Sequence, residues 1–193
     1  MPHRSGQGAV RRTELPAYLI RRRPAAHAEN SARSGQFLIR DAVSSDREAL
    51  ASILFRASRD VFPLAGIERI DKTEFNRQTE GESILVAEED SRPVAFASIW
   101  DAEHFLHHFF VDPDYHRRGI GRSLMVATMM RYGSSLSLKC NTANTRARAF
   151  YRAMGWIETD EPGGESQGTG SWIWIRTPVA AAALGLLPDE QDR

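Results

Sequence analysis

The sequence lacks the residues that build disulfide frameworks and most zinc sites. Its 193 residues include one cysteine, Cys140, so no internal disulfide can form, and no Cys-x-x-Cys pair is present. No apolar run approaches the roughly 20 residues that a membrane helix needs, and the early run at 17–20 is too short for the core of a signal peptide. We therefore expect a cytoplasmic protein in a reducing compartment, with no membrane partner and no bound metal.

The chain also lacks net charge, with 25 Lys plus Arg against 25 Asp plus Glu. A nucleic-acid-binding domain normally carries its basic surface on the folded part. Here residues 1–36 hold seven Arg and two Glu, while residues 37–193 are net acidic. The Pro, Ala, Ser and Gly content of 1–36 is typical of an unstructured extension, although an RNA- or membrane-contacting arm or a transit-like segment would share its Arg content. We expect no nucleic-acid partner.

Hydrophobic periodicity predicts one globular domain over residues 37–178, followed by a tail at 179–193 with at most one helical turn. The polar turn at 89–92 predicts an antiparallel hairpin, and Ser45-Asp-Arg-Glu48 predicts a capping box at the start of a helix. The strands are expected at 37–40, 84–88, 93–100, 104–111, 136–140, 156–159 and 172–175, and the helices after Ser45, at 68–78, from Gly119 to Tyr132 and after Asn144. This order predicts an α/β fold in which helices pack on a mixed sheet.

The most informative stretch runs from Phe109 to Leu124, with the sequence FFVDPDYHRRGIGRSL. A strand that ends in a glycine turn opening a helix leaves backbone N–H groups unpaired at the positive end of the helix dipole. Gly119 and Gly121 would let this backbone approach an anion closely. The pattern predicts a phosphate cradle, but it lacks the third glycine and the downstream acid of a dinucleotide-binding motif.

A second stretch, from Asn144 to Trp156 with the sequence NTRARAFYRAMGW, makes this prediction more specific. The two stretches resemble the signatures of the GNAT acetyltransferase superfamily, Gln/Arg-x-x-Gly-x-Gly/Ala after a strand ending in Val-x-Pro, and Asn-x-x-Ala-x-x-Phe-Tyr-x-x-x-Gly-Phe. His116 stands where the first signature usually has Gln or Arg, and Trp156 where the second has Phe. The resemblance covers about residues 37–177 and implies a mixed, mostly antiparallel central sheet with helices on both faces.

The resemblance implies an N-acetyltransferase that moves an acetyl group directly from acetyl-CoA, or another acyl-CoA, to a primary amine in a ternary complex. The pantetheine arm of acetyl-CoA would lie along the strand ending at Val111, at the point where that strand separates from the strand at 136–140. Guanidinium groups suit the phosphate oxygens, and we expect one or two of Arg117, Arg118 and Arg122 to contact the phosphates. The cofactor-binding residues that it implies are Phe109, Phe110, Val111, Arg117, Arg118, Gly119, Ile120, Gly121, Arg122, Ser123, Asn144 and Tyr151.

Two of these residues have an alternative structural role. Asn144 is expected to cap its helix, whether or not it also bonds the cofactor arm. The resemblance implies that Tyr151 protonates the departing CoA thiolate, but next to Phe150 it could also be a core aromatic residue. Cys140 has no His or Asp neighbour in the sequence, so we expect a buried thiol and not an acyl-cysteine intermediate.

The attacking amine also needs a proton acceptor. Strand alternation predicts that His107 lies in the row of Phe109 and Val111 while His108 lies in the opposite row, and imidazole titrates near neutral pH. His107 is therefore the candidate base, with a buried structural histidine as the alternative. Reserve bases are Glu88, Asp101 and Glu103. A metal trio of His104, His107 and His108 is not expected, because neighbouring strand residues point apart.

The acceptor cannot be read from a motif. The loops at 56–80 and 160–172 are expected to select it, as a small amine or as the amine of a peptide, and their acidic residues could attract a cation: Glu158, Asp160, Glu161 and Glu165. The alternatives are a protein N-terminal or lysine acetyltransferase and a non-catalytic acyl-CoA-binding module. A homodimer through the last strands is compatible with the pattern.

Overall fold

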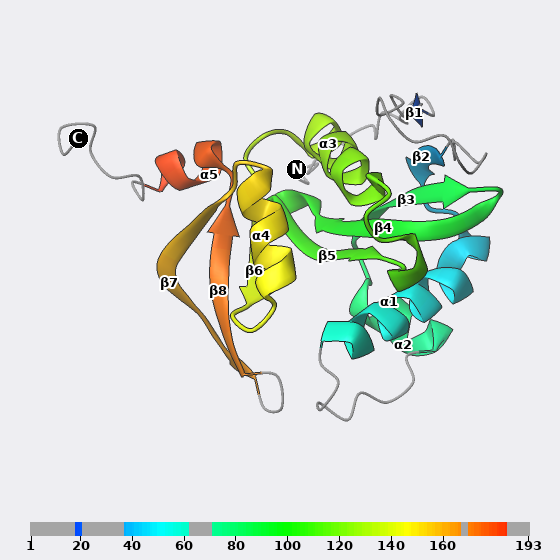
Figure 1. Ribbon diagram of the computed structural model, residues 1–193, viewed down its shortest axis with the longest axis horizontal. Coiled ribbons are helices and arrows are strands. Elements are labelled where there is room, and N and C mark those ends of the chain that lie inside the picture. The colour runs from blue at the N-terminus through cyan, green and yellow to red at the C-terminus, as the bar shows by residue number, and fades with distance from the viewer. Residues whose placement is uncertain (1–17, 21–36, 62–70, 167–169, 185–193) are drawn as a thin grey trace, which may run out of the picture.

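The computed structural model describes residues 18–20, 37–61, 71–166 and 170–184, whose strands form one eight-stranded sheet in the order β1-β2-β3-β4-β5-β6-β8-β7 (Figure 1). The strands are β1 Tyr18–Ile20, β2 Phe37–Asp41, β3 Ser83–Glu89, β4 Arg92–Trp100, β5 Phe105–Val111, β6 Ser137–Asn141, β7 Ile157–Ser166 and β8 Gly170–Arg176. The α-helices are α1 Arg47–Val61, α2 Lys72–Gln78, α3 Ile120–Tyr132, α4 Thr145–Ala153 and α5 Pro178–Ala183. None of the described helices is long and apolar enough to cross a membrane.

The expected mixed, mostly antiparallel sheet is confirmed. Among the described strands, only β5 and β6 run parallel, and every other neighbouring pair is antiparallel. Helices cover both faces, with α3 on the opposite side of the sheet from α1 and α2 (Figure 1). Two hydrophobic clusters match these layers, one that joins the sheet to α3 and α4 and one that joins it to α1 and α2.

The start of α1 differs from the expected capping box. A 3-10 turn, Ser44–Asp46, precedes the helix, and the carboxylate of Asp46 accepts a hydrogen bond from the Val43 N–H at 2.8 Å. Arg40 of β2 holds the same carboxylate from the strand side, at 2.6 Å. The sequence indicated the position of the helix start correctly, but Asp46 makes the cap because a residue on another element fixes its side chain.

Both ends of the chain differ in part from expectation. Tyr18–Ile20, inside the stretch expected to be an unstructured extension, form β1 at the edge of the sheet and pair with β2. Residues 1–17, 21–36 and 185–193 lie outside the described residues, as does the start of the helix expected at 68–78. The tail contains α5, which Thr177 caps by accepting a hydrogen bond from Ala180 N.

The last two strands are longer than expected, because irregular pairing accommodates Pro162 and the glycines that follow it. The ladder between β7 and β8 shifts register on both sides of Pro162. At Gly163 the two backbones lie so close that a Cβ would sit 2.7 Å from the carbonyl carbon and oxygen of Trp172. Only glycine fits there.

We predict that Gly163→Ala destabilises the fold by about 2 kcal/mol or more, since the added methyl group must displace backbone. The measurement is urea unfolding followed by circular dichroism. Glu165→Ala, at an exposed position on the same strand, is the control and should change the free energy of unfolding by less than about 0.5 kcal/mol. Equal stability of the two variants would contradict the close approach of β7 to β8.

Candidate functional site

A cavity of about 390 Å³ lies at the point where β5 and β6 separate. The two strands share one paired position, Phe105 with Ser137, and beyond it each follows a different half of the sheet. The cavity is lined by the end of β5, the turn into α3, the start of α4 and the end of α1. Its walls are Ala57, Val61, Phe109, Phe110, Val111, Tyr115, His116, Arg117, Gly119, Ile120, Gly121, Arg122, Asn144, Arg146, Ala147, Phe150 and Tyr151.

The open end of α3 faces this cavity. Gly119 is the N-cap residue, with a φ of 79°, and the Ser123 N–H makes the first bond within the helix, to Gly119 O at 3.1 Å. The N–H groups of Ile120, Gly121 and Arg122 come before that bond, so they are the donors that a helix start leaves for a ligand. All three residues line the cavity.

Gly121 sits against the cavity wall. A Cβ there would lie 3.4 Å from Val111 Cγ2 and 3.7 Å from Phe150 Cε2. A methyl group could be accommodated at these distances, whereas a branched side chain would extend into the space between strand and helix. The glycine pair predicted from the sequence therefore has two roles, a left-handed turn at Gly119 and an open wall at Gly121.

The turn between β5 and α3 is held in place by side chains. His116 Nε2 donates to Val111 O at 3.1 Å, so this ring stabilises the strand end as well as lining the cavity. From α1, Arg56 donates to Asp112 at 2.9 Å and to Asp114 at 2.7 Å. The cradle is thereby fixed to both its own strand and the opposite helix layer.

The three arginines of the cradle separate into two groups. Arg117 and Arg122 line the cavity. Arg118 instead donates to Glu89 at 2.6 Å and lies over the Tyr115 ring, 5.0 Å from its centroid. Neither Arg118 nor Ser123, both predicted to bind the cofactor, is part of the cavity wall; the remaining ten predicted cofactor-binding residues are.

Helix α4 contributes Asn144 and Tyr151 to the cavity. The expected cap is confirmed, because the Asn144 side chain accepts from the Ala147 N–H at 3.0 Å. Tyr151 is 7% exposed and packs against Phe109, Phe150 and Trp156. Burial raises the pKa of the Tyr151 phenol, and nearby Cys140 raises it further, so the phenol stays protonated and can act as a donor.

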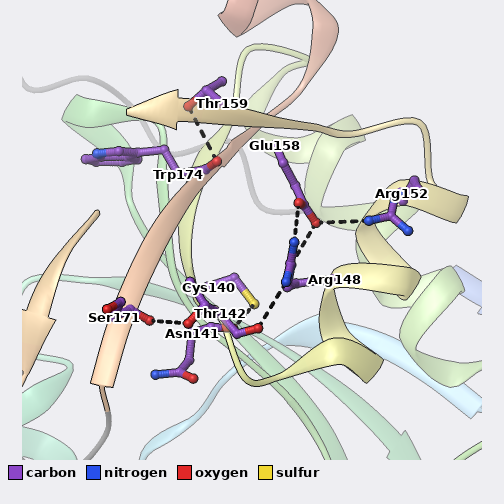
Figure 2. Close-up of polar contacts among 9 residues, drawn as sticks. All are labelled: Cys140, Asn141, Thr142, Arg148, Arg152, Glu158, Thr159, Ser171 and Trp174. Atoms are coloured by element: carbon purple, nitrogen blue, oxygen red, sulfur yellow. Dashed lines mark hydrogen bonds and ion pairs between the residues drawn. The ribbon is translucent and has the colours of Figure 1, made fainter. Parts of the chain in front are cut away.

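A network of polar contacts fastens α4 to the sheet beside the cavity (Figure 2). Arg148 donates to Glu158 of β7 at 2.7 Å and 3.0 Å and to the Thr142 carbonyl at 3.0 Å. The hydrogen bonds from Arg148 hold the pKa of Glu158 below its usual range. Glu158 is thus neutralised inside the protein and does not attract a cationic acceptor, contrary to expectation. Glu161 is likewise paired, with Arg176.

Cys140 lies behind α4, on β6, and is 5% exposed. Its Sγ lies 3.6 Å from the carbonyl oxygen of Asn141, the next residue (Figure 2). Burial raises the pKa of the thiol to about 11, which disfavours the thiolate that an acyl-cysteine intermediate would need. The expectation of a buried thiol is confirmed.

The predicted position of His107 is wrong, because β5 contains a β-bulge. The register with β4 shifts between Ser98 and Ile99, which pair with His108 and Leu106 and leave His107 as the extra residue. Leu106, not His107, therefore belongs to the cluster of Phe109 and Val111. His107 is absent from the cavity wall; its ring stacks on His108, with centroids 3.9 Å apart.

The two histidines meet Glu82, a residue that the sequence did not single out. The Glu82 carboxylate bonds to His107 Nδ1 and accepts from the Trp100 indole N–H. Burial by itself would raise the pKa of Glu82, but the bonds from His107 and Trp100 and the nearby Ser98 hydroxyl outweigh burial and lower it. Burial lowers the pKa of His108 to about 4, so its imidazole is neutral.

Sequence reasoning also missed the walls that α1 and the first turn of α4 supply. Ala57 and Val61 close the cavity from the α1 side, and Arg146 on α4 forms an ion pair with Asp60 at the end of α1. The hydrophobic periodicity of the sequence shows only that Ala57 lies on the buried face of α1. Arg146 and Asp60 are 86 positions apart in the sequence, and their contact depends on the divergence of β5 and β6. No short stretch of the sequence indicates that divergence.

Residues 60–170 match the acetyltransferase (GNAT) domain family. Similar solved structures include a ribosomal-protein-alanine N-acetyltransferase from Brucella melitensis, at 22% identity and a TM-score of 0.57, covering 72% of this chain and 98% of that one. YncA from Salmonella typhimurium, solved with its cofactor acetyl-CoA, matches at 19% identity and a TM-score of 0.57, over 72% of this chain and 91% of that one.

A third similar structure, the PaiA N-acetyltransferase from Thermoplasma acidophilum in complex with coenzyme A, matches at 18% identity and a TM-score of 0.57, over 73% of this chain and 98% of that one. Among curated proteins, none matches this sequence. The identities to the solved structures support the fold, and the family match covers more than half of the chain. With the glycine cradle on α3 and the parting of β5 from β6, these findings show that the chain belongs to the GNAT acetyltransferase family.

Proposed function

We propose that this protein transfers an acetyl group from acetyl-CoA to a primary amine, directly and in a ternary complex. One observation carries the proposal: a single cavity combines the open start of α3, the unpaired end of β5 and the buried phenol of Tyr151. These three features provide donors for a diphosphate, a strand edge for an amide-bearing arm and a proton donor for a thiolate. Family members with CoA or acetyl-CoA bound are among the similar structures.

The backbone supports one arrangement of the cofactor. The pyrophosphate would accept hydrogen bonds from the N–H groups at 120–122 and from the guanidinium groups of Arg117 and Arg122, two of the three arginines on the cavity wall. The pantetheine amides would pair with β5 near Phe109 to Val111, where β6 no longer does. Asn144 uses its carbonyl oxygen for the helix cap, which leaves its NH₂ group to donate to the arm.

The transfer requires two proton movements. The lone pair of a neutral amine attacks the thioester carbonyl carbon, the C–N bond forms, and the C–S bond then breaks to release the CoA thiolate. Tyr151 gives its phenolic proton to that sulfur, and a base takes the proton that the amine loses. The low polarity around Phe109, Phe150 and Trp156 keeps the phenol protonated until a negative charge develops beside it.

For the base we retain His107, on grounds other than strand alternation. Its side chain is 38% exposed on the α1 and α2 side of β5, two residues from Phe109, and Glu82 engages its Nδ1. A carboxylate at Nδ1 fixes the ring and stabilises the imidazolium that forms when the other nitrogen takes a proton. Among the reserve bases, Glu88 pairs with Arg40 and Asp101 accepts from Ser83. Like His107, none of the three reserve bases lines the cavity.

The acceptor class is tested by a screen. Small primary amines and peptides with different N-terminal residues are incubated with acetyl-CoA, and release of free thiol is followed. Two similar structures are ribosomal-protein-alanine N-acetyltransferases, so the peptide set includes N-terminal alanine. Acceptor-dependent thiol release with a mass gain of one acetyl group supports the proposal. Tight acetyl-CoA binding with no turnover on any acceptor would instead support an acyl-CoA-binding module.

The cradle predicts a graded effect at Gly121. Gly121→Val should weaken acetyl-CoA binding by about 10- to 100-fold, because its branches fill the space in front of the helix N–H groups and displace one or more charge-assisted hydrogen bonds. Gly121→Ala is the matched control and should lose much less, since its Cβ meets Val111 at 3.4 Å. Isothermal titration calorimetry gives both affinities. Equal affinity of the valine variant, alanine variant and wild type would exclude the cradle.

The proton donor predicts a turnover effect without a binding effect. Tyr151→Phe keeps the ring contacts and removes the hydroxyl, so kcat should fall by about 10²-fold while the Kd for acetyl-CoA stays within twofold. Steady-state kinetics and calorimetry provide the two numbers. If the variant turns over at the wild-type rate, Tyr151 is a packing residue.

Loss of the proposed base should likewise lower turnover without weakening the binding of acetyl-CoA. His107→Gln retains a hydrogen-bonding group toward Glu82 and should lower kcat by about 10²-fold with unchanged acetyl-CoA affinity. The assay is run in chelator-treated buffer, and His104→Gln, at an exposed position before β5, is the control. If kcat is unaffected in the His107 variant, the role of base passes to Glu88, Asp101, Glu103 or water.

A further inference from the structure

We propose that Glu82, His107 and His108 form a binding site for one divalent transition-metal ion, with Zn²⁺ as the probe. Each residue offers one ligand atom, and these atoms lie within 4.8 Å of one another. The cluster lies outside the wall of the cavity described above. This inference goes beyond acetyl transfer and does not depend on it, but the two roles of His107 exclude each other, because a bound ion would displace the Glu82 contact that supports the base.

The β-bulge in β5 brings the two imidazoles together. In a regular strand, consecutive side chains point to opposite faces. The extra residue in β5 turns His107 onto the face of its neighbour, so the rings of His107 and His108 stack with an interplanar angle of 27°. Adjacent histidines therefore converge on Glu82, which reaches them from the segment just before β3.

Two of the atoms in this cluster are buried without a hydrogen-bond partner. The Glu82 side chain is 0% exposed, and its Oε2 makes no hydrogen bond of regular geometry, although the Ser98 hydroxyl lies near the carboxylate. His108 Nε2 is buried and unpaired as well. Native proteins rarely leave a carboxylate oxygen and an imidazole nitrogen unsatisfied together in one place. One cation bound between these two atoms would coordinate both of them.

A further contact orients the carboxylate. The Trp100 indole N–H donates to Glu82 Oε1, the same oxygen that bonds His107 Nδ1. Outer hydrogen bonds of this kind fix metal-binding carboxylates and raise metal affinity. A bound ion would take the place of the hydrogen bond between Glu82 and His107 Nδ1.

The ligand types select the class of metal. Two imidazole nitrogens and one carboxylate oxygen form a recognised zinc ligand set, whereas Mg²⁺ and Ca²⁺ prefer oxygen ligands. Two zinc bonds of about 2.1 Å at a tetrahedral angle place their ligand atoms about 3.4 Å apart, so a separation as wide as 4.8 Å must shorten by about 1.4 Å when the ion binds. The half-exposed His107 ring can make that movement, and its open side admits the ion and a fourth, water ligand.

The test is calorimetric titration of ZnCl₂ into untagged, chelator-stripped protein without acetyl-CoA. We expect one site per chain in the wild type and at least a tenfold loss of affinity in Glu82→Gln and in His108→Gln. Trp100→Phe, which keeps all three ligands, should weaken binding by 10- to 100-fold as an outer-contact change does. MgCl₂ should give no binding at this site.

His104→Gln is the matched control, because His104 is an exposed histidine of the same segment that is not part of the cluster. Its zinc affinity should equal that of the wild type. Thermal unfolding of each variant, with and without zinc, keeps the result interpretable, since zinc should raise the Tm of the wild type and of His104→Gln but not that of Glu82→Gln. Failure of the wild type to bind zinc, or equal zinc affinity in all variants, overturns the proposal and leaves the acetyl-transfer experiments unaffected.

Discussion

The parting of one parallel strand pair determines the rest of this structure. β5 and β6 are the single parallel neighbours among the described strands, and they share one paired position. Parallel neighbours need a crossover connection, and α3 is that connection. Its first turn must therefore start at the carboxyl end of β5, where the strands have diverged. The topology alone brings an open helix start, an unpaired strand edge and a cavity to one place.

Features with a local cause could be predicted from the sequence. Gly119 supplies the left-handed turn before α3, and Asn144 caps α4, both as expected. Element order and the mixed sheet follow from periodicity and turn residues. These signals act within a few residues of each other, so they are visible without knowledge of what packs across the sheet.

Features that depend on a distant partner could not be predicted. Alternation along β5 holds from Phe109 to Val111 but fails at His107, because the bulge is set by register against β4. Charged side chains behave in the same way. By residue type Arg118 is a candidate phosphate ligand, but it pairs with Glu89. Glu158 is a candidate to attract a cation, but Arg148 pairs with it. In each case the residue type was informative, but its direction depended on another element.

The bulge also separates two kinds of chemistry on β5. Downstream of it, Phe109 and Val111 face α3 and α4 and give the cavity an apolar wall. At the bulge, His107 and His108 face the α1 and α2 side and meet a buried carboxylate. In the proposed transfer, the acyl donor and His107 would therefore lie on different sides of one strand, so that the proton of the amine would reach His107 through water. Tyr151 needs no such separation to stay protonated, because burial alone raises the pKa of its phenol.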